Sequence, residues 1–275
     1  MTLPAGTALA PASAAPVTPR DAATVALLRD GSQGPEAFLL HRVSAMPFAA
    51  GMTVFPGGGV DPRDADASLA WHGPAPAEWA GWFGCSPELA RALVCAAVRE
   101  TFEESGVLLA GPCDGSENDG NAGIVADTTP FAAARQALVN RELSLAEFLT
   151  DANLVVRADL LRPWANWVTP VGEKRRYDAR FFLARLPEGQ HADGHTTEAD
   201  HVDWVRPADA LADWRAGRRQ LLPPTFTTLA ELAAFDTVTA AMAAPRSPNK
   251  VEPRLVRDHD TVRIVLPGDP RWERP

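Results

Sequence analysis

The stretch RETFEESGV, residues Arg99–Val107, decides how the chain is interpreted. Glu100, Glu103 and Glu104 stand at i, i+3 and i+4, so a helix through them presents three carboxylates on one face within one turn. Like charges at this spacing cost an isolated helix ~0.2–0.5 kcal/mol per pair, and the helix dipole also disfavours anions near a C-terminus. A hard divalent cation, Mg²⁺ or Mn²⁺, reverses both penalties because it binds several oxygens and supplies positive charge. The stretch therefore predicts a metal site, and the alternative for an acidic run is a solvated helix face.

The helix that carries this stretch has clear start and end signals. Ser86 is a favoured N-cap residue, Pro87 suits the first helical position, and Glu88 puts a negative charge in the first turn. No helix breaker follows until Gly106, which suits the left-handed position just beyond a helix. These signals predict a helix from Pro87 to Ser105.

Short apolar runs bounded by turn residues predict strands on both sides of this helix. Residues 23–28 and 37–41 flank the turn sequence DGSQGP and predict a hairpin. Residues 52–55 predict a third strand, which the glycines of Pro56-Gly57-Gly58-Gly59 would end. Further strands are expected at residues 180–186 and 202–205, and a last hairpin at residues 254–256 and 262–266.

The other segments give weaker signals. Residues 62–84 are rich in Trp, Pro and Gly and have no clean period, so we interpret them as an excursion from the core. Residues 131–141 and 145–152 predict two short helices. The Thr228-x-x-Glu231 pattern is typical of a capping box and predicts a helix that begins there and reaches Met242.

Composition limits the class of protein. The 275 residues carry 26 Lys and Arg against 35 Asp and Glu, a formal net charge of −9, with a pI near 5.2. Such an acidic surface repels polyphosphate, so we expect no nucleic-acid partner and a small phosphate-bearing ligand only at a local cationic site. No apolar run is long enough to cross a membrane. The three cysteines form no CxxC pair, which favours a reducing compartment over a structural zinc.

Strands and helices interleave, so we expect an α/β (α+β) fold with one principal core. Residues 1–19 are interpreted as a disordered Ala/Pro-rich tail, and residues 20–270 as a single domain. Within it, we expect an insert at residues 65–86 and a helical segment at residues 130–165.

Two separated stretches together resemble the Nudix box of the Nudix hydrolases. That box has Gly, five residues, Glu, seven residues, and then Arg-Glu-aliphatic-x-Glu-Glu-x-Gly-aliphatic. Here Gly58 and five residues lead to Asp64, and Arg99–Val107 supply the second half. Asp64 replaces a Glu, Thr101 replaces an aliphatic residue, and a long insertion separates the halves.

The insertion is similar to that of the Nudix subfamily that includes the coenzyme A diphosphatase Nudix-type motif 19. Similar stretches also occur at residues 48–59, 167–170, 175–182 and 266–269. The resemblance implies a Nudix fold, a mixed β-sheet sandwiched between helices, with a helical insertion. It also implies an enzyme that hydrolyses a diphosphate bond in a nucleoside diphosphate derivative, with coenzyme A or acyl-coenzyme A as the favoured substrate. The alternatives are ADP-ribose or NADH as the substrate, and a Nudix-fold sensor without catalysis, for which three clustered anions have no use.

The resemblance assigns roles to individual residues. Glu100, Glu103 and Glu104, with the Gly58 carbonyl, are expected to bind Mg²⁺ or Mn²⁺, and Arg99 to orient the carboxylates. Glu198, in a loop before Trp204, is ranked first as the general base and Glu103 second; the alternative for Glu198 is a solvated loop acid. The candidates for binding substrate phosphates are Arg42, Arg175, Arg176 and Arg180. For the basic run at residues 174–180, the alternative is that its charges are solvated at the start of a strand.

The expected partner is a small-molecule nucleotide. We expect neither a nucleic acid nor a membrane as a partner, and association of two chains into a homodimer is left as an alternative to a monomer. The chain ends in Glu-Arg-Pro and not in a peroxisomal tripeptide, so the cytoplasm is the expected location.

Overall fold

The computed structural model describes residues 17–43, 49–113, 123–196, 199–258 and 261–269. Its centre is a mixed eight-stranded sheet in the order β10-β2-β1-β9-β8-β11, with β3 beside β2 and β4 beside β1. The strands of this sheet are β1 (Arg20–Gly31), β2 (Gly34–Arg42), β3 (Thr53–Val54), β4 (Gly57–Gly59), β8 (Leu161–Val168), β9 (Tyr177–Arg185), β10 (Ala199–Val205) and β11 (Lys250–Val251). The predicted hairpin is confirmed as β1 and β2, which pair antiparallel, whereas β1 and β9 pair parallel.

The two faces of the sheet bury two separate hydrophobic cores. Along β1, Val25 and Leu27 belong to one core, whereas Ala26 and Leu28 belong to the other. This alternation follows from the two-residue period of a strand, which sends successive side chains to opposite faces. Because both faces are covered at the centre of the sheet, β1 is apolar on both sides, which explains its nearly continuous apolar run.

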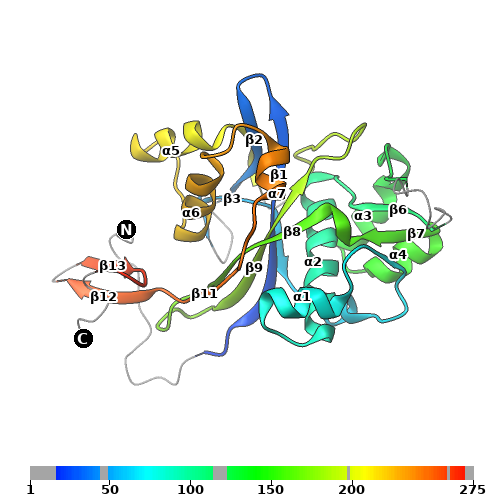
Figure 1. The fold of residues 1–275 in the computed structure, drawn as a ribbon, viewed down its shortest axis with the longest axis horizontal. Helices are drawn as coiled ribbons and strands as arrows, with labels where there is room; N and C mark the ends of the chain where they lie inside the picture. Colours follow the sequence, from blue (N-terminus) through cyan, green and yellow to red (C-terminus); the bar gives the residue numbers. More distant parts are fainter. Residues whose placement is uncertain (1–16, 44–48, 114–122, 197–198, 259–260, 270–275) are drawn as a thin grey trace.

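Helices cover both faces of the sheet, with α2 on one side and α5 and α6 on the other (Figure 1). The helices are α1 (Pro76–Phe83), α2 (Pro87–Ser105), α3 (Ala132–Val139), α4 (Leu145–Asp151), α5 (Pro207–Arg215), α6 (Pro223–Leu232) and α7 (Val238–Ala243), with short 3₁₀ turns η1 (Pro62–Ala65), η2 (Thr129–Phe131) and η3 (Ala158–Leu160). The predicted mixed sheet between helices is therefore confirmed.

Helix α2 has the predicted bounds. The Ser86 hydroxyl accepts a hydrogen bond from the backbone N–H of Leu89, and Gly106 closes the helix with a φ of 73°. A left-handed residue at this position suits glycine because it has no Cβ. Within this helix, the i, i+3 and i+4 spacing places Glu100, Glu103 and Glu104 on one face.

The expected insert contains a helix. Helix α1 lies within residues 65–86, and its Trp79 ring packs 5.5 Å from the ring of Phe182 in the central sheet. Just before α1, strand β5 (Trp71–His72) pairs with β7 (Leu154–Arg157), which in turn pairs with β6 (Ala110–Pro112), so the insert extends a second, three-stranded sheet. The irregular stretch is thus packed against the core.

The expected helical segment at residues 130–165 is wrong in its last part. The helices end at Asp151, and β7 and most of β8 occupy the remaining residues. Asn153 breaks the helical path with a φ of 53°, and the β-branched Val155 and Val156 favour a strand. Full burial of all four β7 residues removes the alternating pattern that identifies a strand in sequence.

The expected helix start at Thr228 is also wrong. Helix α6 begins at Pro223, which suits the first helical position, and Thr228 is buried in its interior. Helix α6 ends at Leu232, and a second helix, α7, begins after Thr237. The Thr237 hydroxyl accepts a hydrogen bond from the N–H of Ala240.

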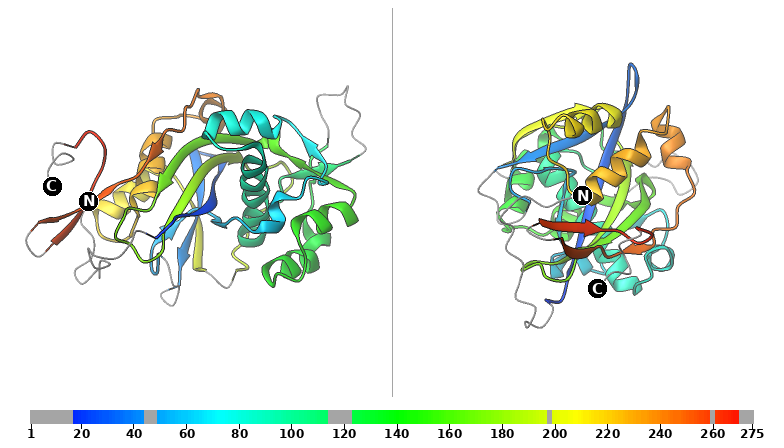
Figure 2. Two further views of the ribbon diagram at one scale, coloured as in Figure 1. Left: turned by 90° about the horizontal axis from the view of Figure 1, so that it is seen from below. Right: turned by 90° about the vertical axis from the view of Figure 1, so that its left-hand side faces the viewer.

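The predicted last hairpin is confirmed as β12 (Arg254–Asp258) and β13 (Thr261–Val265), which project from one end of the molecule (Figure 2). The three cysteines, Cys85, Cys95 and Cys113, form no disulfide. None of the described helices combines the length and apolar character needed to span a bilayer.

Candidate active site

Strand β4 and helix α2 bring the two separated motif halves together. Glu104, on α2, accepts a hydrogen bond through Oε2 from the backbone N–H of Gly57, at 2.8 Å. Gly58 packs directly on Glu100, because a Cβ atom on Gly58 would lie 2.5 Å from Oε1 of that glutamate. The glycines thus let the backbone of β4 approach the carboxylates more closely than any other residue allows.

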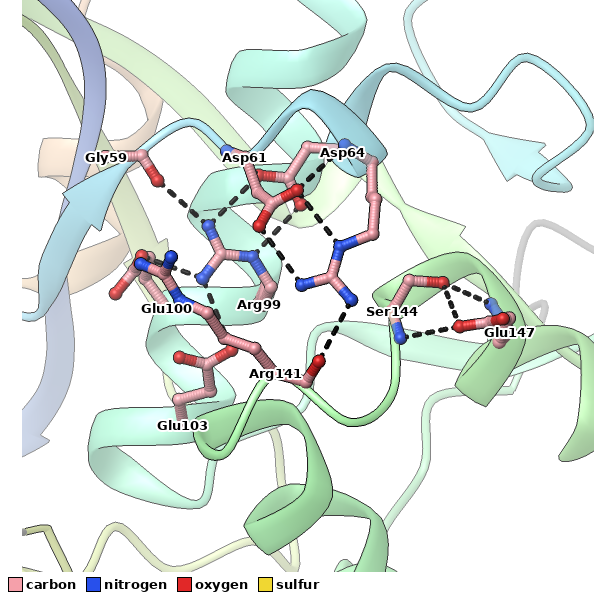
Figure 3. A network of polar contacts seen from close by, with 10 residues as sticks. Gly59, Asp61, Asp64, Arg99, Glu100, Glu103, Arg141, Ser144 and Glu147 are labelled. Carbon is pink, nitrogen blue, oxygen red and sulfur yellow. Dashed lines mark hydrogen bonds and ion pairs between the residues drawn. The ribbon is translucent and has the colours of Figure 1, made fainter.

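Arg99 is the centre of a polar network that joins the motif halves (Figure 3). Its guanidinium donates two hydrogen bonds to the Asp64 carboxylate, from Nε to Oδ1 and from Nη2 to Oδ2, each 3.0 Å long. Nη1 donates to Glu100 Oε1 at 2.8 Å and to Glu103 Oε1 at 3.2 Å. Nη2 also donates to the Gly59 carbonyl at 3.0 Å. A bidentate pair of this kind fixes both position and orientation, so Asp64 is the anchor of Arg99.

The 3₁₀ turn η1 holds Asp64 in place. Asp64 accepts a hydrogen bond from the N–H of Asp61, and its side chain is 2% exposed. Asp61 in turn accepts hydrogen bonds from the Arg63 guanidinium, which lower the pKa of Asp61 to about 2. Arg63 also donates to the carbonyl of Arg141, at the end of α3. The turn therefore connects the motif to the end of α3.

Burial and the positive charge of Arg99 act in opposite directions on the pKa of Glu100 and of Glu103. Burial raises the pKa of Glu100 to about 7, against the opposing effect of the Arg99 charge. Burial raises the pKa of Glu103 as well, again opposed by Arg99 and more weakly by Arg141. For Arg99, burial acts to lower the pKa, but the hydrogen bonds to Asp64 and the charge of Glu100 raise it overall. Desolvation therefore disfavours three adjacent carboxylates unless more positive charge is present.

These side chains face a cavity of about 660 Å³. One part of its lining is charged and the other is apolar and aromatic. The charged lining residues are Arg20, Asp21, Arg42, Asp61, Arg63, Arg99, Glu100, Glu103, Glu104, Arg141 and Arg175. The apolar part includes Val54, Phe55, Trp167, Phe181, Leu222 and Pro224. A pocket of this size with both characters suits a small molecule that has an anionic end and a less polar end.

The sequence-predicted site residues separate into three groups. Gly58, Arg99, Glu100, Glu103, Glu104, Arg42 and Arg175 all line the cavity. Arg176 and Arg180 are not among its lining residues; they are buried in ion pairs elsewhere. Glu198 lies outside the described residues.

The two buried arginines hold strands together. Arg176 donates to the carbonyls of Thr169 and Val17 and pairs with Glu252. Arg180 pairs with Asp21 on the neighbouring strand and with Asp178 on its own strand. The sequence shows a uniform basic run, but in the loop before β9 Arg175 is exposed and lines the cavity, whereas Arg176 is buried by its contacts with neighbouring segments.

The oxygen atoms of Glu100, Glu103, Glu104 and Gly58 are the donors that this site offers to a divalent ion. In the part of the chain that the structure describes, no three His, Cys, Asp or Glu side chains are spaced as a ready-made metal site. The reason is visible in the network, since Arg99 bonds both Glu100 and Glu103 while Glu104 turns to the Gly57 N–H. The donors are all oxygens, which suits Mg²⁺ or Mn²⁺, and Gly58 brings its backbone against Glu100 where a Cβ would not fit. The residues present therefore fit a hard divalent cation.

Sequence reasoning did not single out Arg20, Arg63 and Arg141, which also line the cavity. Arg63 and Arg141 come from segments on either side of α2, and only the tertiary fold brings them beside it. No local pattern marks them. The Gly58-to-Asp64 spacing did mark Asp64, although its partner Arg99 is 35 residues away.

Arg135, on α3, joins α2 to the loop that follows β9. Its Nε donates to the Glu103 carbonyl, its Nη1 to Asp193 and its Nη2 to the His195 carbonyl. Gln190 in the same loop is buried, bonds both backbone groups of Leu108 and donates to the Val125 carbonyl. These contacts hold the loop beside the end of α2, where Thr196 lines the cavity.

Comparison with known families and proteins adds to this geometry. Residues 86–232, more than half of the chain, match the model of the family described as NUDT19 Nudix domain. A protein of Xenopus laevis named acyl-coenzyme A diphosphatase NUDT19 is 29% identical over 64% of this chain and 49% of its own length. The human protein of the same name is 29% identical over 86% of this chain and 72% of its own length. The chain thus spans about half the length of the frog relative.

The fold also has a counterpart among solved structures. The crystal structure of a Nudix hydrolase from Alicyclobacillus acidocaldarius superposes with a TM-score of 0.70 and 28% identity. The superposition covers 84% of this chain and 99% of that chain. The likeness therefore extends over most of this chain.

Proposed function

This chain belongs to the family of the NUDT19 Nudix domain, and from that premise we propose that it is a metal-dependent hydrolase of a diphosphate bond in a nucleoside diphosphate derivative. The favoured substrate is coenzyme A or an acyl-coenzyme A. One observation carries the proposal: Glu100, Glu103 and Glu104 share one cavity with Arg42 and Arg175. Such a cavity offers oxygen ligands for a cation beside guanidinium groups for phosphates.

The proposed ligands of Mg²⁺ or Mn²⁺ are the carboxylates of Glu100, Glu103 and Glu104 and the carbonyl of Gly58. When bound, the ion would neutralise charge on the diphosphate oxygens and lower the pKa of water. The support from this chain is the oxygen-only donor set and the burial that raises the pKa of Glu100 and Glu103.

The other residues act by orientation and proton transfer. Arg99 holds the carboxylates of Glu100 and Glu103 through hydrogen bonds while Asp64 holds Arg99. Glu198 is the first candidate for the base that accepts the proton of the attacking water, and Glu103 the second. The raised pKa of Glu103 suits proton acceptance nearer neutral pH than an exposed glutamate would.

The proposed substrate fits the two characters of the cavity. Arg42 and Arg175 are proposed to bind phosphate groups away from the scissile bond, and the wall that includes Trp167 and Phe181 to accept less polar parts of the molecule. The names of the frog and human relatives favour an acyl-coenzyme A over other dinucleotides. The three unpaired cysteines favour a reducing compartment such as the cytoplasm.

A product screen tests the proposal. The purified chain is incubated with coenzyme A, an acyl-coenzyme A, ADP-ribose or NADH, each with Mg²⁺ or Mn²⁺. Coenzyme A should give 3′,5′-ADP and 4′-phosphopantetheine. The Glu103→Gln, Glu104→Gln double variant is the control and should lose at least about a hundredfold in kcat, as expected when metal ligands are removed.

Other outcomes would select another function. AMP from ADP-ribose or NADH, without cleavage of coenzyme A, would make the chain a dinucleotide pyrophosphatase. No product from any substrate with either metal, combined with tight nucleotide binding, would make it a sensor. The three carboxylates argue against the sensor, since binding an anionic nucleotide gains nothing from adjacent anions.

A further inference from the structure

We propose that Arg141 is a catalytic residue that contacts the scissile diphosphate, an inference that rests on the function proposed above. Arg141 follows the end of α3 and lines the same cavity as Glu100, Glu103 and Glu104. Its side chain extends from the end of α3 back towards Glu100 and Glu103 (Figure 3). An anion held at these glutamates by a cation would therefore meet the guanidinium of Arg141.

The backbone of Arg141 is in a conformation that residues other than glycine rarely adopt. Its φ is 61°, in the left-handed region, which costs a non-glycine residue ~1–2 kcal/mol. The turn is held firmly, because the N–H of Arg141 donates to the Leu138 carbonyl and its own carbonyl accepts from Arg63. A glycine would close the same turn without strain. Backbone strain of this kind is concentrated at functional sites, which gives a second reason to assign the side chain a role.

Neighbouring cavity arginines are already engaged with carboxylates. Arg99 bonds Asp64, Glu100 and Glu103, and Arg63 bonds Asp61. Within the described ranges, Arg141 makes no ion pair at 4.0 Å or less, and Arg141 is exposed to solvent. Its planar guanidinium can therefore bind two oxygens of an incoming diphosphate without losing an existing salt bridge.

The role follows from the charge that develops during hydrolysis. The oxygen of water forms a new P–O bond while the bond from phosphorus to the bridging oxygen breaks. The water proton passes to the general base, and the electron pair of the broken bond leaves with the departing phosphate. Negative charge spreads over the non-bridging oxygens meanwhile, and an arginine that donates hydrogen bonds to them lowers the barrier.

Two substitutions and one control test the assignment. Arg141→Gly removes the guanidinium and relieves the strain, so its Tm should equal or exceed that of the wild type, while kcat should fall on the order of a hundredfold or more. Arg141→Lys keeps a charge without the fork and should recover part of the lost kcat. Asn153→Gly is the matched control, because Asn153 also has a positive φ, 53°, and is not among the cavity residues. It should keep full kcat.

A binding measurement separates this proposal from the proposed function. Calorimetry with adenosine 5′-(α,β-methylene)diphosphate and Mg²⁺ reports contact with an uncleavable diphosphate, and Arg141→Gly should weaken its binding about tenfold. If the wild type cleaves no substrate but shows this loss, the proposed hydrolysis fails and the contact stands.

Three results would overturn the assignment. The first is kcat and analogue affinity within twofold of the wild type for a folded Arg141→Gly. The second is a wild type that neither cleaves substrates nor binds the analogue. The third is a loss of activity in Arg141→Gly that follows a loss of folding, combined with full activity of a folded Arg141→Lys.

Discussion

Gly58 and Glu100 are in such close contact that no methyl group fits between them: a Cβ on Gly58 would lie 2.5 to 2.7 Å from the three atoms of the carboxylate. We predict that Gly58→Ala displaces Glu100, lowers the affinity for Mn²⁺ by ~10–100-fold and costs ~1–3 kcal/mol of stability. Isothermal titration with Mn²⁺ and urea unfolding measure the two effects. Gly59→Ala is the control, since a Cβ there meets no atom within 4 Å. Equal effects of both substitutions would contradict the steric explanation.

The pair of Asp64 and Arg99 should be important for stability. Their side chains are 2% and 11% exposed, and Asp64→Asn removes the charge from one side of a buried bidentate pair. We expect the free energy of unfolding to fall by about 3 kcal/mol, measured by urea denaturation. Asp61→Asn, on the more exposed pair with Arg63, should cost less than about 1 kcal/mol. Similar losses in the two variants would show that burial does not control the effect.

The raised pKa of Glu100 predicts coupling between protons and metal. Without metal, burial holds the pKa of Glu100 at about 7, above its ordinary value of 4.5. The folded chain therefore holds a proton that the unfolded chain has lost, so this group's contribution to stability is complete below pH 4.5 and disappears as pH rises through 7. A metal ion must displace that proton. Titrations of Mg²⁺ at pH 6 in two buffers of different ionisation enthalpy should show proton release, which should vanish near pH 8.5. A Glu100→Gln variant that released the same number of protons would contradict this origin.

Arg175 and Arg176 are adjacent in sequence but should respond differently to substitution. Arg175 is exposed and lines the cavity, so Arg175→Ala should raise KM for coenzyme A about tenfold, or about 1.4 kcal/mol, at unchanged stability. Arg176 is buried among Thr169, Val17 and Glu252, so Arg176→Ala should cost about 2–3 kcal/mol of stability. Steady-state kinetics and thermal unfolding of both variants check this. A stable Arg176→Ala variant with a raised KM would return Arg176 to the substrate site.

Local chemistry explains which elements were predictable. Helix α2 has the predicted bounds because Ser86, Pro87 and Gly106 act within a few residues of its ends. Strand β7 was missed because all four of its residues are buried, so its pattern does not differ from that of a buried helix. The break between α6 and α7 was missed because threonine is a residue type that often caps helices, yet Thr228 lies inside a helix that begins at Pro223.

The candidate site was predictable as far as sequence neighbours define it. The three glutamates share one turn, and the spacing from Gly58 marked Asp64. The separate surroundings of Arg175 and Arg176, and the approach of Arg141 to the glutamates, depend on contacts between segments distant in the chain. Such contacts have no local pattern, so only the tertiary structure distinguishes an arginine that lines the cavity from one that joins two strands.

The parallel pairing of β1 with β9 also has a consequence for synthesis on the ribosome. Asp21 and Arg180, which join these strands, are 159 residues apart, so the first strand emerges long before its neighbour is translated. Until then β1 exposes an unpaired apolar edge, and contacts between distant residues form slowly. The nascent chain can form the β1–β2 hairpin early, but the sheet under the glutamates closes only after β9 leaves the exit tunnel. Chaperone protection should therefore matter most during translation of the residues between these two strands.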